Sequence, residues 1–190
     1  MREIIVTPVD IPGPLVVVPP RFEDARGRFS ETWSRPALAA AGLDVDFVQD
    51  NQSLSRSAGT VRGLHYQAPP FAQAKLVSVI RGAVLDVAVD ARRGSRHYGR
   101  HVAVELSEAN GRQLFVPEGF LHGFITLSPD TYVAYKVTAP YSPVHDGAIS
   151  WDDADLAIDW GPAGANPILS DKDRAAPLFR DFQSPFEFTG

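Results

Sequence analysis

The sequence predicts an all-β protein, built as an antiparallel sandwich or barrel. Short apolar or alternating segments recur along its 190 residues, and 16 prolines and 15 glycines separate them. Two segments, residues 85–90 and 101–106, alternate cleanly between apolar and polar residues. That pattern is typical of strands with two unlike faces. Many short strands at such spacing favour a double-sheet or barrel architecture.

The expected strands follow one another along most of the chain. They cover residues 15–18, 61–67, 74–81, 83–90, 101–106, 113–116, 120–127 and 131–138. The first ends at Pro19-Pro20 and the second at Pro69-Pro70, because proline and glycine punctuate regular structure.

One helix is expected near the start of the chain. Ser34 or Arg35 would cap it, Pro36 suits its first turn, and Gly42 ends it. From Trp151 onward the chain is rich in Asp and Pro. We expect loops and single helical turns there, wrapped on the barrel.

Length and composition indicate one domain over residues 1–190. The net charge is −5, from 18 basic against 23 acidic residues, which disfavours a nucleic-acid partner. There is no cysteine, and this excludes disulfides, zinc–thiolate sites and a Cys nucleophile. No signal peptide is evident and no apolar run approaches about 18 residues, so we expect a cytoplasmic protein without a membrane segment.

Two segments resemble the paired motifs of the cupin superfamily in their glycine and proline spacing. They span residues 59–82 and 111–122. The resemblance implies a jelly-roll, a small double-sheet β-barrel, with short peripheral helices.

The ligand positions of these motifs do not suit a metal ion. A metal-binding cupin has two His and one Glu in the first motif and one His in the second; here the set is His65, Gln67, Lys75 and His122. A divalent ion needs neutral or anionic donors, and a charged Lys offers no lone pair. We therefore expect a metal-free pocket suited to proton transfer on an anionic or enolate-forming ligand.

Longer motifs occur in one order through the chain. They are Phe22-x-Asp24-x-Arg26-Gly27-x-Phe29-x-Glu31, Gln49-Asp50-Asn51-x-Ser53, Val61-Arg62-Gly63-Leu64-His65-Tyr66-Gln67, Gln73-x-Lys75-Leu76-Val77, Asp86-Val87-Ala88-Val89-Asp90, Val116-Pro117-x-Gly119-Phe120-x-His122-Gly123-Phe124, Tyr135-Lys136 and Leu169-Ser170-x-Lys172-Asp173. With these motifs the chain resembles the dTDP-4-dehydrorhamnose 3,5-epimerase family from about residue 5 to residue 180.

The resemblance implies a homodimer that converts dTDP-4-dehydro-6-deoxy-D-glucose to dTDP-4-dehydro-L-rhamnose without a dissociable cofactor. The family's base matches His65, its general acid matches Tyr135, and the Asp paired with the His matches Asp173. The positions that match substrate contacts are Arg26, Glu31, Gln49, Asp50, Asn51, Arg62, His122, Asp146 and Lys172. In the family the segment with Arg26 and Glu31 reaches into the partner subunit's site.

The chemistry accounts for these residue types. A C4 ketone acidifies the hydrogens on C3 and C5, so epimerisation needs a base on one face of the ring and an acid on the other. Imidazole, with an ordinary pKa of about 6.5, suits the base role of His65, and a carboxylate such as Asp173 fixes its tautomer. Tyr135 offers a phenol as donor, and Lys75 can hold the negative charge that develops on O4.

The sequence departs from the family in two places. Members commonly have Glu where this chain has Asp146, which implies a shorter contact or one bridged by water. Ala139-Pro140 replaces a polar–aromatic pair before Tyr141, and Pro stiffens this loop.

Other polar residues receive structural interpretations. Asp86 and Asp90 share one face of a strand, and we expect a structural or supporting role for both. The arginines at 92, 93, 96 and 100 are interpreted as a solvated loop.

Three rival functions remain open from sequence. One is an epimerase that acts at a single carbon in another deoxysugar pathway. A second is a metal-dependent cupin, either an oxygenase or a sugar-phosphate isomerase. The third is a non-catalytic binder of sugar nucleotides or carbohydrates.

Overall fold

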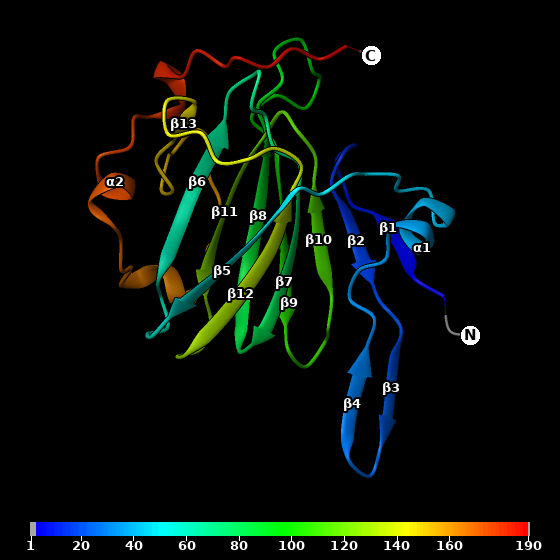
Figure 1. Ribbon diagram of the computed structural model, residues 1–190. Coiled ribbons are helices and arrows are strands. Elements are labelled where there is room, and N and C mark those ends of the chain that lie inside the picture. The colour runs from blue at the N-terminus through cyan, green and yellow to red at the C-terminus, as the bar shows by residue number, and fades with distance from the viewer. Residues whose placement is uncertain (1–2, 190) are drawn as a thin grey trace.

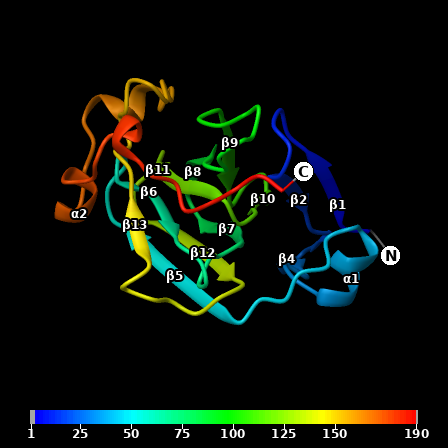
Figure 2. The same cartoon turned by 90° about the horizontal axis from the view of Figure 1, so that it is seen from above.

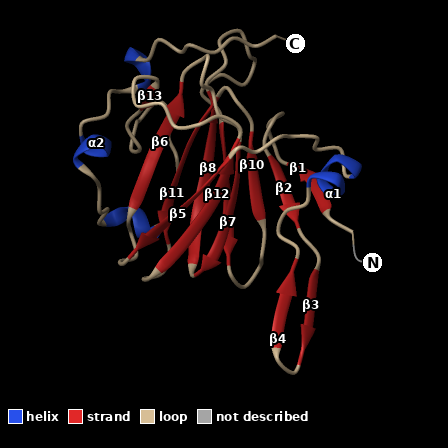
Figure 3. Ribbon diagram, in the orientation of Figure 1, coloured by secondary structure: helices blue, strands red, loops and turns tan. Residues whose placement is uncertain are grey.

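The computed structural model describes residues 3–189, and antiparallel strands are its main regular structure (Figures 1 and 3). A six-stranded sheet has the order β1-β2-β10-β7-β12-β5, and a five-stranded sheet has the order β13-β6-β11-β8-β9. The strands are β1 (Ile5–Pro8), β2 (Leu15–Val18), β3 (Arg21–Asp24), β4 (Gly27–Ser30), β5 (Gln49–Ser55), β6 (Val61–Gln67), β7 (Lys75–Arg81), β8 (Ala83–Asp90), β9 (His101–Ser107), β10 (Gln113–Val116), β11 (Phe120–Thr126), β12 (Thr131–Val137) and β13 (Asp146–Ala148). The prediction of an all-β, double-sheet protein is confirmed.

Every expected strand is present, with each end within one residue of its expected position. Strands β1, β3, β4, β5 and β13 were not expected. Strand β5 has the sequence QDNQSLS, which shows no apolar alternation, and it pairs only with β12 at the edge of its sheet. Its place in the sheet therefore comes from backbone pairing rather than from a buried face.

The main core lies between the two sheets. Val77 on β7, Leu114 on β10 and Val133 on β12 meet Val84 and Ala88 on β8, and all five are at most 1% exposed. Burial of such apolar side chains, at about 25 cal/mol per Å², holds the two sheets together.

The segment from Ile149 onward covers the outer face of the five-stranded sheet (Figure 2). Trp151, Trp160 and Phe186 pack there against Val87 and Ile125. This segment contains only single turns: the 3-10 turns Pro162–Ala165 and Phe179–Asp181 and the helix α2 (Asp171–Arg174). The expectation of loops and single helical turns on the barrel is confirmed.

Helix α1 (Arg35–Ala40) begins after Ser34, close to the expected start. Its Leu38 is 2% exposed and packs with Leu76 and Phe115 on the outer face of the six-stranded sheet. Gly42 follows the helix with φ +91°, a left-handed conformation that explains why glycine ends it.

The hairpin of β3 and β4 projects away from the two sheets (Figure 1). Its Phe22 and Phe29 are 46% and 68% exposed, and their ring centroids lie 6.3 Å apart. This exposed aromatic pair has no place in the core of its own chain.

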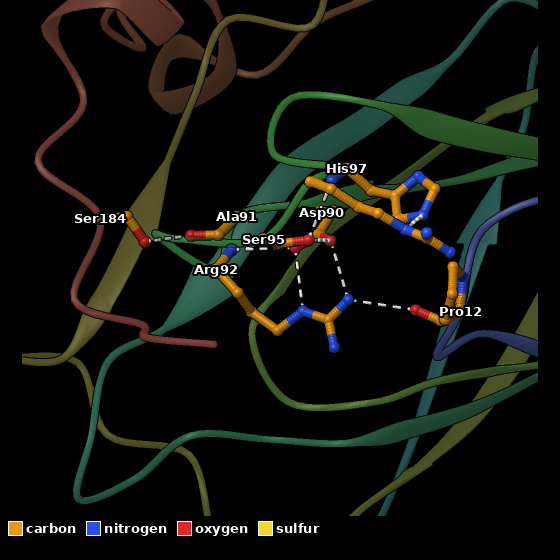
Figure 4. A network of polar contacts seen from close by, with 8 residues as sticks. Pro12, Asp90, Ala91, Arg92, Ser95, His97 and Ser184 are labelled. Carbon is orange, nitrogen blue, oxygen red and sulfur yellow. Dashed lines mark hydrogen bonds and ion pairs between the residues drawn. The ribbon is translucent and has the colours of Figure 1, made fainter. Parts of the chain in front are cut away.

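The interpretation of Arg92 as a solvated loop residue is wrong (Figure 4). Its guanidinium donates to both oxygens of the fully buried Asp90, at 2.9 and 2.8 Å, and to the carbonyl oxygen of Pro12. The same group lies over the rings of Phe120 and Phe188, at 4.5 and 5.0 Å from their centroids. Burying the Asp90 carboxylate without a cationic partner would be costly, so the Arg92 side chain points inward to pair with it.

Residues 3–189 contain no helix that is both long enough and apolar enough to cross a bilayer.

Candidate active site

A cavity of about 360 Å³ lies among strands of both sheets. Strands β5, β7 and β12 of the larger sheet and β6 and β11 of the smaller sheet contribute to it, and the segment around α2 closes one side. Six predicted site residues line this cavity: Arg62, His65, Lys75, His122, Tyr135 and Asp173. The fold thus gathers residues that lie up to 111 positions apart in sequence, from 62 to 173.

His65 and Asp173 form a short hydrogen bond at the cavity wall. His65 Nε2 lies 2.5 Å from Asp173 Oδ1; the side chain of His65 is 30% exposed and that of Asp173 is 4% exposed. Because Nε2 is bound to the carboxylate, Nδ1 is the ring nitrogen that remains for a substrate. The carboxylate favours the tautomer with the proton on Nε2, so Nδ1 keeps its lone pair and can act as a base.

Ser170 holds the carboxylate of Asp173 in place. It is the N-cap of α2, and its Oγ donates to Asp173 Oδ2 at 2.7 Å while accepting from Asp173 N at 3.1 Å. Burial acts to raise the pKa of Asp173, but the hydrogen bonds from His65 and Ser170 outweigh it and lower that pKa. Asp173 therefore stays ionised at neutral pH.

A second His–Asp pair lies beside the first. His122 on β11 stands opposite His65 on β6 in the strand register. Its Nε2 lies 2.8 Å from Oδ1 of Asp86, which is fully buried behind the cavity. Burial lowers the pKa of His122, although Asp86 acts to raise it, so the imidazole is neutral at neutral pH.

Lys75 contributes a buried cation to the cavity, which Arg62 also lines. Burial lowers the pKa of its ammonium from 10.5 to about 8, while Asp86 and Asp146 act to raise it. Within residues 3–189 no carboxylate forms an ion pair with it. A charged, unpaired ammonium that lines a cavity is suited to bind an oxyanion.

Tyr135 on β12 and Arg62 on β6 line the cavity from different sheets. Burial raises the pKa of Tyr135, against a lowering effect of Arg62, and its phenol is therefore protonated at neutral pH. The Arg62 guanidinium donates to Ser55 Oγ and to the carbonyl oxygen of Leu54, both at 3.3 Å.

Asp146 and Lys172 form an ion pair beside the cavity. Tyr141 OH donates to the same Asp146 oxygen at 3.1 Å, and Lys172 comes from α2, next to Asp173. The shorter Asp146 side chain thus still reaches a basic partner in this chain.

Five other predicted contact residues have different surroundings. Gln49 donates to Asn51 Oδ1 at 2.8 Å, whereas Asp50 faces the opposite side of β5 and pairs with Lys136 at 2.7 Å. Arg26 lies on the projecting hairpin, paired with Asp24, and the exposed Glu31 follows β4. None of these five lines the cavity of its own chain.

Sequence reasoning missed two hydroxyl groups. Ser53 Oγ is buried at the cavity, without a hydrogen-bond partner among the described residues. Ser53 follows Asn51 by two residues, so strand alternation places both on one face, but β5 was not identified as a strand. The hydroxyl of Ser170 was missed as well, although Ser three residues before Asp173 is a capping pattern.

The donor set at the motif positions does not assemble around a metal ion. The Gln67 amide donates to the carbonyl oxygens of Phe71 and Pro140 and accepts from Ser142 N, so it serves the neighbouring loops. In the described part of the chain, no three His, Cys, Asp or Glu side chains are grouped as metal ligands would be.

Comparison with known proteins gives a consistent result. The family model for dTDP-4-dehydrorhamnose 3,5-epimerase matches residues 8–181. The dTDP-4-dehydrorhamnose 3,5-epimerase of Sinorhizobium fredii is 50% identical over 173 residues, which are 91% of this chain and 88% of the relative.

Solved structures agree in fold as well as in sequence. The dTDP-6-deoxy-D-glucose-3,5-epimerase of Legionella pneumophila, in complex with dTDP-4-keto-L-rhamnose, is 40% identical with a TM-score of 0.93, covering 99% of this chain and 100% of that one. A 3'-monoepimerase of Streptomyces bikiniensis, in complex with dTDP-quinovose, is 34% identical with a TM-score of 0.84, covering 90% and 86%. The prediction of a cupin-type jelly roll is thereby confirmed.

Proposed function

The chain belongs to the dTDP-4-dehydrorhamnose 3,5-epimerase family, and we propose that its cavity inverts C3 and C5 of a dTDP-linked 4-keto-6-deoxy sugar, with His65 as base and Tyr135 as acid. The enzyme is an isomerase of dTDP-L-rhamnose biosynthesis. Its substrate is dTDP-4-dehydro-6-deoxy-D-glucose, and its product is dTDP-4-dehydro-L-rhamnose.

One observation carries the assignment of roles. His65 and Tyr135 line the same cavity but come from opposite sheets, on β6 and β12. A sugar ring bound between them has one face toward the imidazole and the other toward the phenol. This arrangement suits removal of a proton from one face and delivery of a proton to the other.

The proposed step at each carbon is balanced. His65 Nδ1 takes the proton from the carbon next to the ketone, and the electron pair of the C–H bond moves to form the enolate, with its charge on O4. Tyr135 OH gives its proton to the same carbon from the opposite face, and the enolate collapses to the ketone. The imidazolium then returns its proton through solvent to the phenolate, which restores both groups.

Lys75 and His122 complete the proposed machinery at O4. The ammonium of Lys75 has no protein counter-ion at contact distance in the described residues, so it can pair with the enolate oxygen. A preorganised cation of this kind can contribute several kcal/mol, about 3–4, to a transition state in a shielded site. Arg62 and Lys172 supply charge for the diphosphate, because guanidinium and ammonium groups bind phosphate oxygens.

We further propose that two copies share their sites through the β3–β4 hairpin. The hairpin projects from the body, its Phe22 and Phe29 are exposed, and Arg26 and Glu31 lie outside the cavity of their own chain. The outer face of the six-stranded sheet carries a groove of about 500 Å³ beside the 52% exposed Ile80. These features support a homodimer whose hairpins supply Arg26 and Glu31 to the partner's cavity.

The test is turnover of the dTDP-4-keto sugar in deuterated water. Deuterium at both C3 and C5 of the product is expected. Deuterium at one carbon only would favour the single-carbon epimerase, a candidate that the likeness to the Streptomyces bikiniensis 3'-monoepimerase keeps open. Loss of turnover on chelation would favour a metal-dependent cupin, and dTDP binding without turnover would favour a non-catalytic binder.

A further inference from the structure

The cavity contains two His–Asp pairs, and only one of them has a role in the proposed proton transfers. His65 is bound to Asp173, and His122, its partner in the strand register, is bound to Asp86. In both pairs the carboxylate holds Nε2, which leaves Nδ1 of the imidazole for a ligand. The two imidazoles are thus held by a carboxylate in the same way, but the surroundings of the two pairs differ.

The carboxylates differ in how their second oxygens are satisfied. Asp173 Oδ2 accepts from Ser170 Oγ at 2.7 Å. Asp86 Oδ2 is buried and has no hydrogen-bond partner in the described chain, and the residue is 0% exposed. An ionised carboxylate in such a place is costly unless a nearby cation balances it.

Lys75 is the cation that can balance Asp86. Both residues lie next to His122: Asp86 is hydrogen-bonded to its ring, and Lys75 lines the same cavity wall. The other charged or titratable groups around the ammonium are Asp146 on β13, Lys172 and Asp173 on α2, Arg62 and His65 on β6, His122 on β11 and Tyr135 on β12. Of the three acidic groups in this region, Asp146 already pairs with Lys172 and Asp173 with His65, which leaves Asp86 for Lys75.

We propose that Asp86 is a positioning residue for the reaction: its carboxylate orients His122 toward the sugar through Oδ1, and its unpaired Oδ2 supplies the buried negative charge that keeps Lys75 an ammonium. This inference rests on the proposed function, because the ammonium matters as the partner of the enolate oxygen. Asp86 itself lies behind the cavity wall and does not touch the sugar.

The two roles proposed for Asp86, accepting a hydrogen bond from His122 and supplying a negative charge, can be tested separately. In an Asp86→Asn variant the amide oxygen can still accept from His122 Nε2, so the imidazole keeps its orientation while the negative charge is removed. Lys75 then loses its buried counter-charge and gives up its proton at lower pH. An opposite charge at about 4–6 Å changes a pKa by roughly one unit or more.

The chain has only three lysines, Lys75, Lys136 and Lys172, so the proton on Lys75 can be observed directly. Protein labelled with ¹³C-lysine gives three Cε signals, and the Lys75→Met variant identifies the signal of Lys75. We expect the Lys75 midpoint in Asp86→Asn to fall by about one pH unit relative to wild type. The alkaline limb of the kcat profile should move by the same amount.

Asp90 provides the matched control. It is also a fully buried aspartate on β8, four residues away, but its charge is taken by Arg92. Asp90→Asn should lower the melting temperature and leave the Lys75 midpoint unchanged. Asp86→Ser, a second neutral variant, repeats the measurement if Asp86→Asn does not fold.

An unchanged Lys75 midpoint in a folded Asp86 variant would overturn the proposal. Loss of folding in both Asp86 variants would also overturn it, since it would assign Asp86 to the fold alone. The titration needs no turnover, so a wild-type protein that fails to act on the 4-keto sugar rejects the proposed function without changing this outcome.

Discussion

His65 Nε2 and Asp173 Oδ1 lie 2.5 Å apart, although 108 residues of sequence separate them. One residue is on a central strand and the other on a single-turn helix near the end of the chain. Through Nε2, the hydrogen bond therefore fixes the orientation of the imidazole by the packing of the C-terminal segment on the five-stranded sheet. The base has its tautomer set before any substrate arrives.

His65→Ala is expected to abolish deuterium exchange at both C3 and C5. The variant lacks the imidazole assigned as the base, and general-base catalysis contributes about 10²–10⁴ in rate. Solvent exchange into the dTDP-4-keto sugar, followed by NMR, measures the effect. His97→Ala, which lies outside the cavity, is the control, and it should exchange at the wild-type rate. Retention of exchange at either carbon in His65→Ala would remove His65 from the base role.

Tyr135→Phe is expected to spare exchange more than net inversion. The base can still remove a proton and return solvent deuterium from the same face, but delivery to the opposite face needs the phenol. The measurement compares deuterium incorporation in the remaining substrate with formation of the inverted product. Equal loss of both would count against Tyr135 as the acid.

The sequence allowed the double-sheet fold to be predicted because buried strands keep apolar side chains, as on β8 and β11. Strand β5 was missed since its polar residues carry no such pattern, and with it the buried hydroxyl of Ser53. The pairing of Asp173 with His65 was predicted from the family motif alone, because no local periodicity of the sequence relates a helical turn to a distant strand. Arg92 was misinterpreted because its side chain points inward to pair with Asp90, and the sequence pattern does not show that Asp90 is fully buried.

Activity is expected to decline as the pH rises through about 8, where burial places the pKa of Lys75. The ammonium form falls from about nine-tenths at pH 7 to about one-tenth at pH 9, and the enolate loses its counter-charge with it. A pH profile of kcat measures the limb. A profile that stays flat to pH 10 would exclude Lys75 as the partner of O4.

The same shift has a consequence for stability with a definite sign. The folded-state pKa of Lys75 is below its unfolded value of 10.5, so the folded protein carries a cost while Lys75 is protonated. That cost is fully present below pH 8 and disappears between pH 8 and 10.5. The wild type should therefore gain stability as the pH rises from 8 to 10.5, and Lys75→Met, which lacks the titrating group, should not show this gain in urea unfolding at several pH values.

Arg92→Ala is expected to destabilise the protein by about 3 kcal/mol, since removing one partner of a buried ion pair leaves a charge uncompensated. Asp90 is fully buried, and Arg92 also joins the N-terminal loop at Pro12 to the ring of Phe188 near the C-terminus. Urea unfolding measures the loss. Arg93→Ala, which breaks only the exposed pair with Glu187, should cost less than about 1 kcal/mol. Similar effects for the two variants would contradict this account.

Mixing two inactive variants is expected to restore activity if the hairpin completes the partner's cavity. Arg26→Ala removes a contact that a subunit gives to its partner, whereas His65→Ala removes a group that acts in its own cavity. In a mixed dimer, one cavity combines the intact His65 of one chain with the intact Arg26 of the other, so it is complete. Turnover of the mixture, after subunit exchange, should exceed the sum of the two separate preparations several-fold. If Arg26 acts in the cavity of its own chain, both cavities of a mixed dimer remain defective. If Arg26 has no role, Arg26→Ala is already active by itself. In either case mixing does not raise turnover above the sum of the separate preparations.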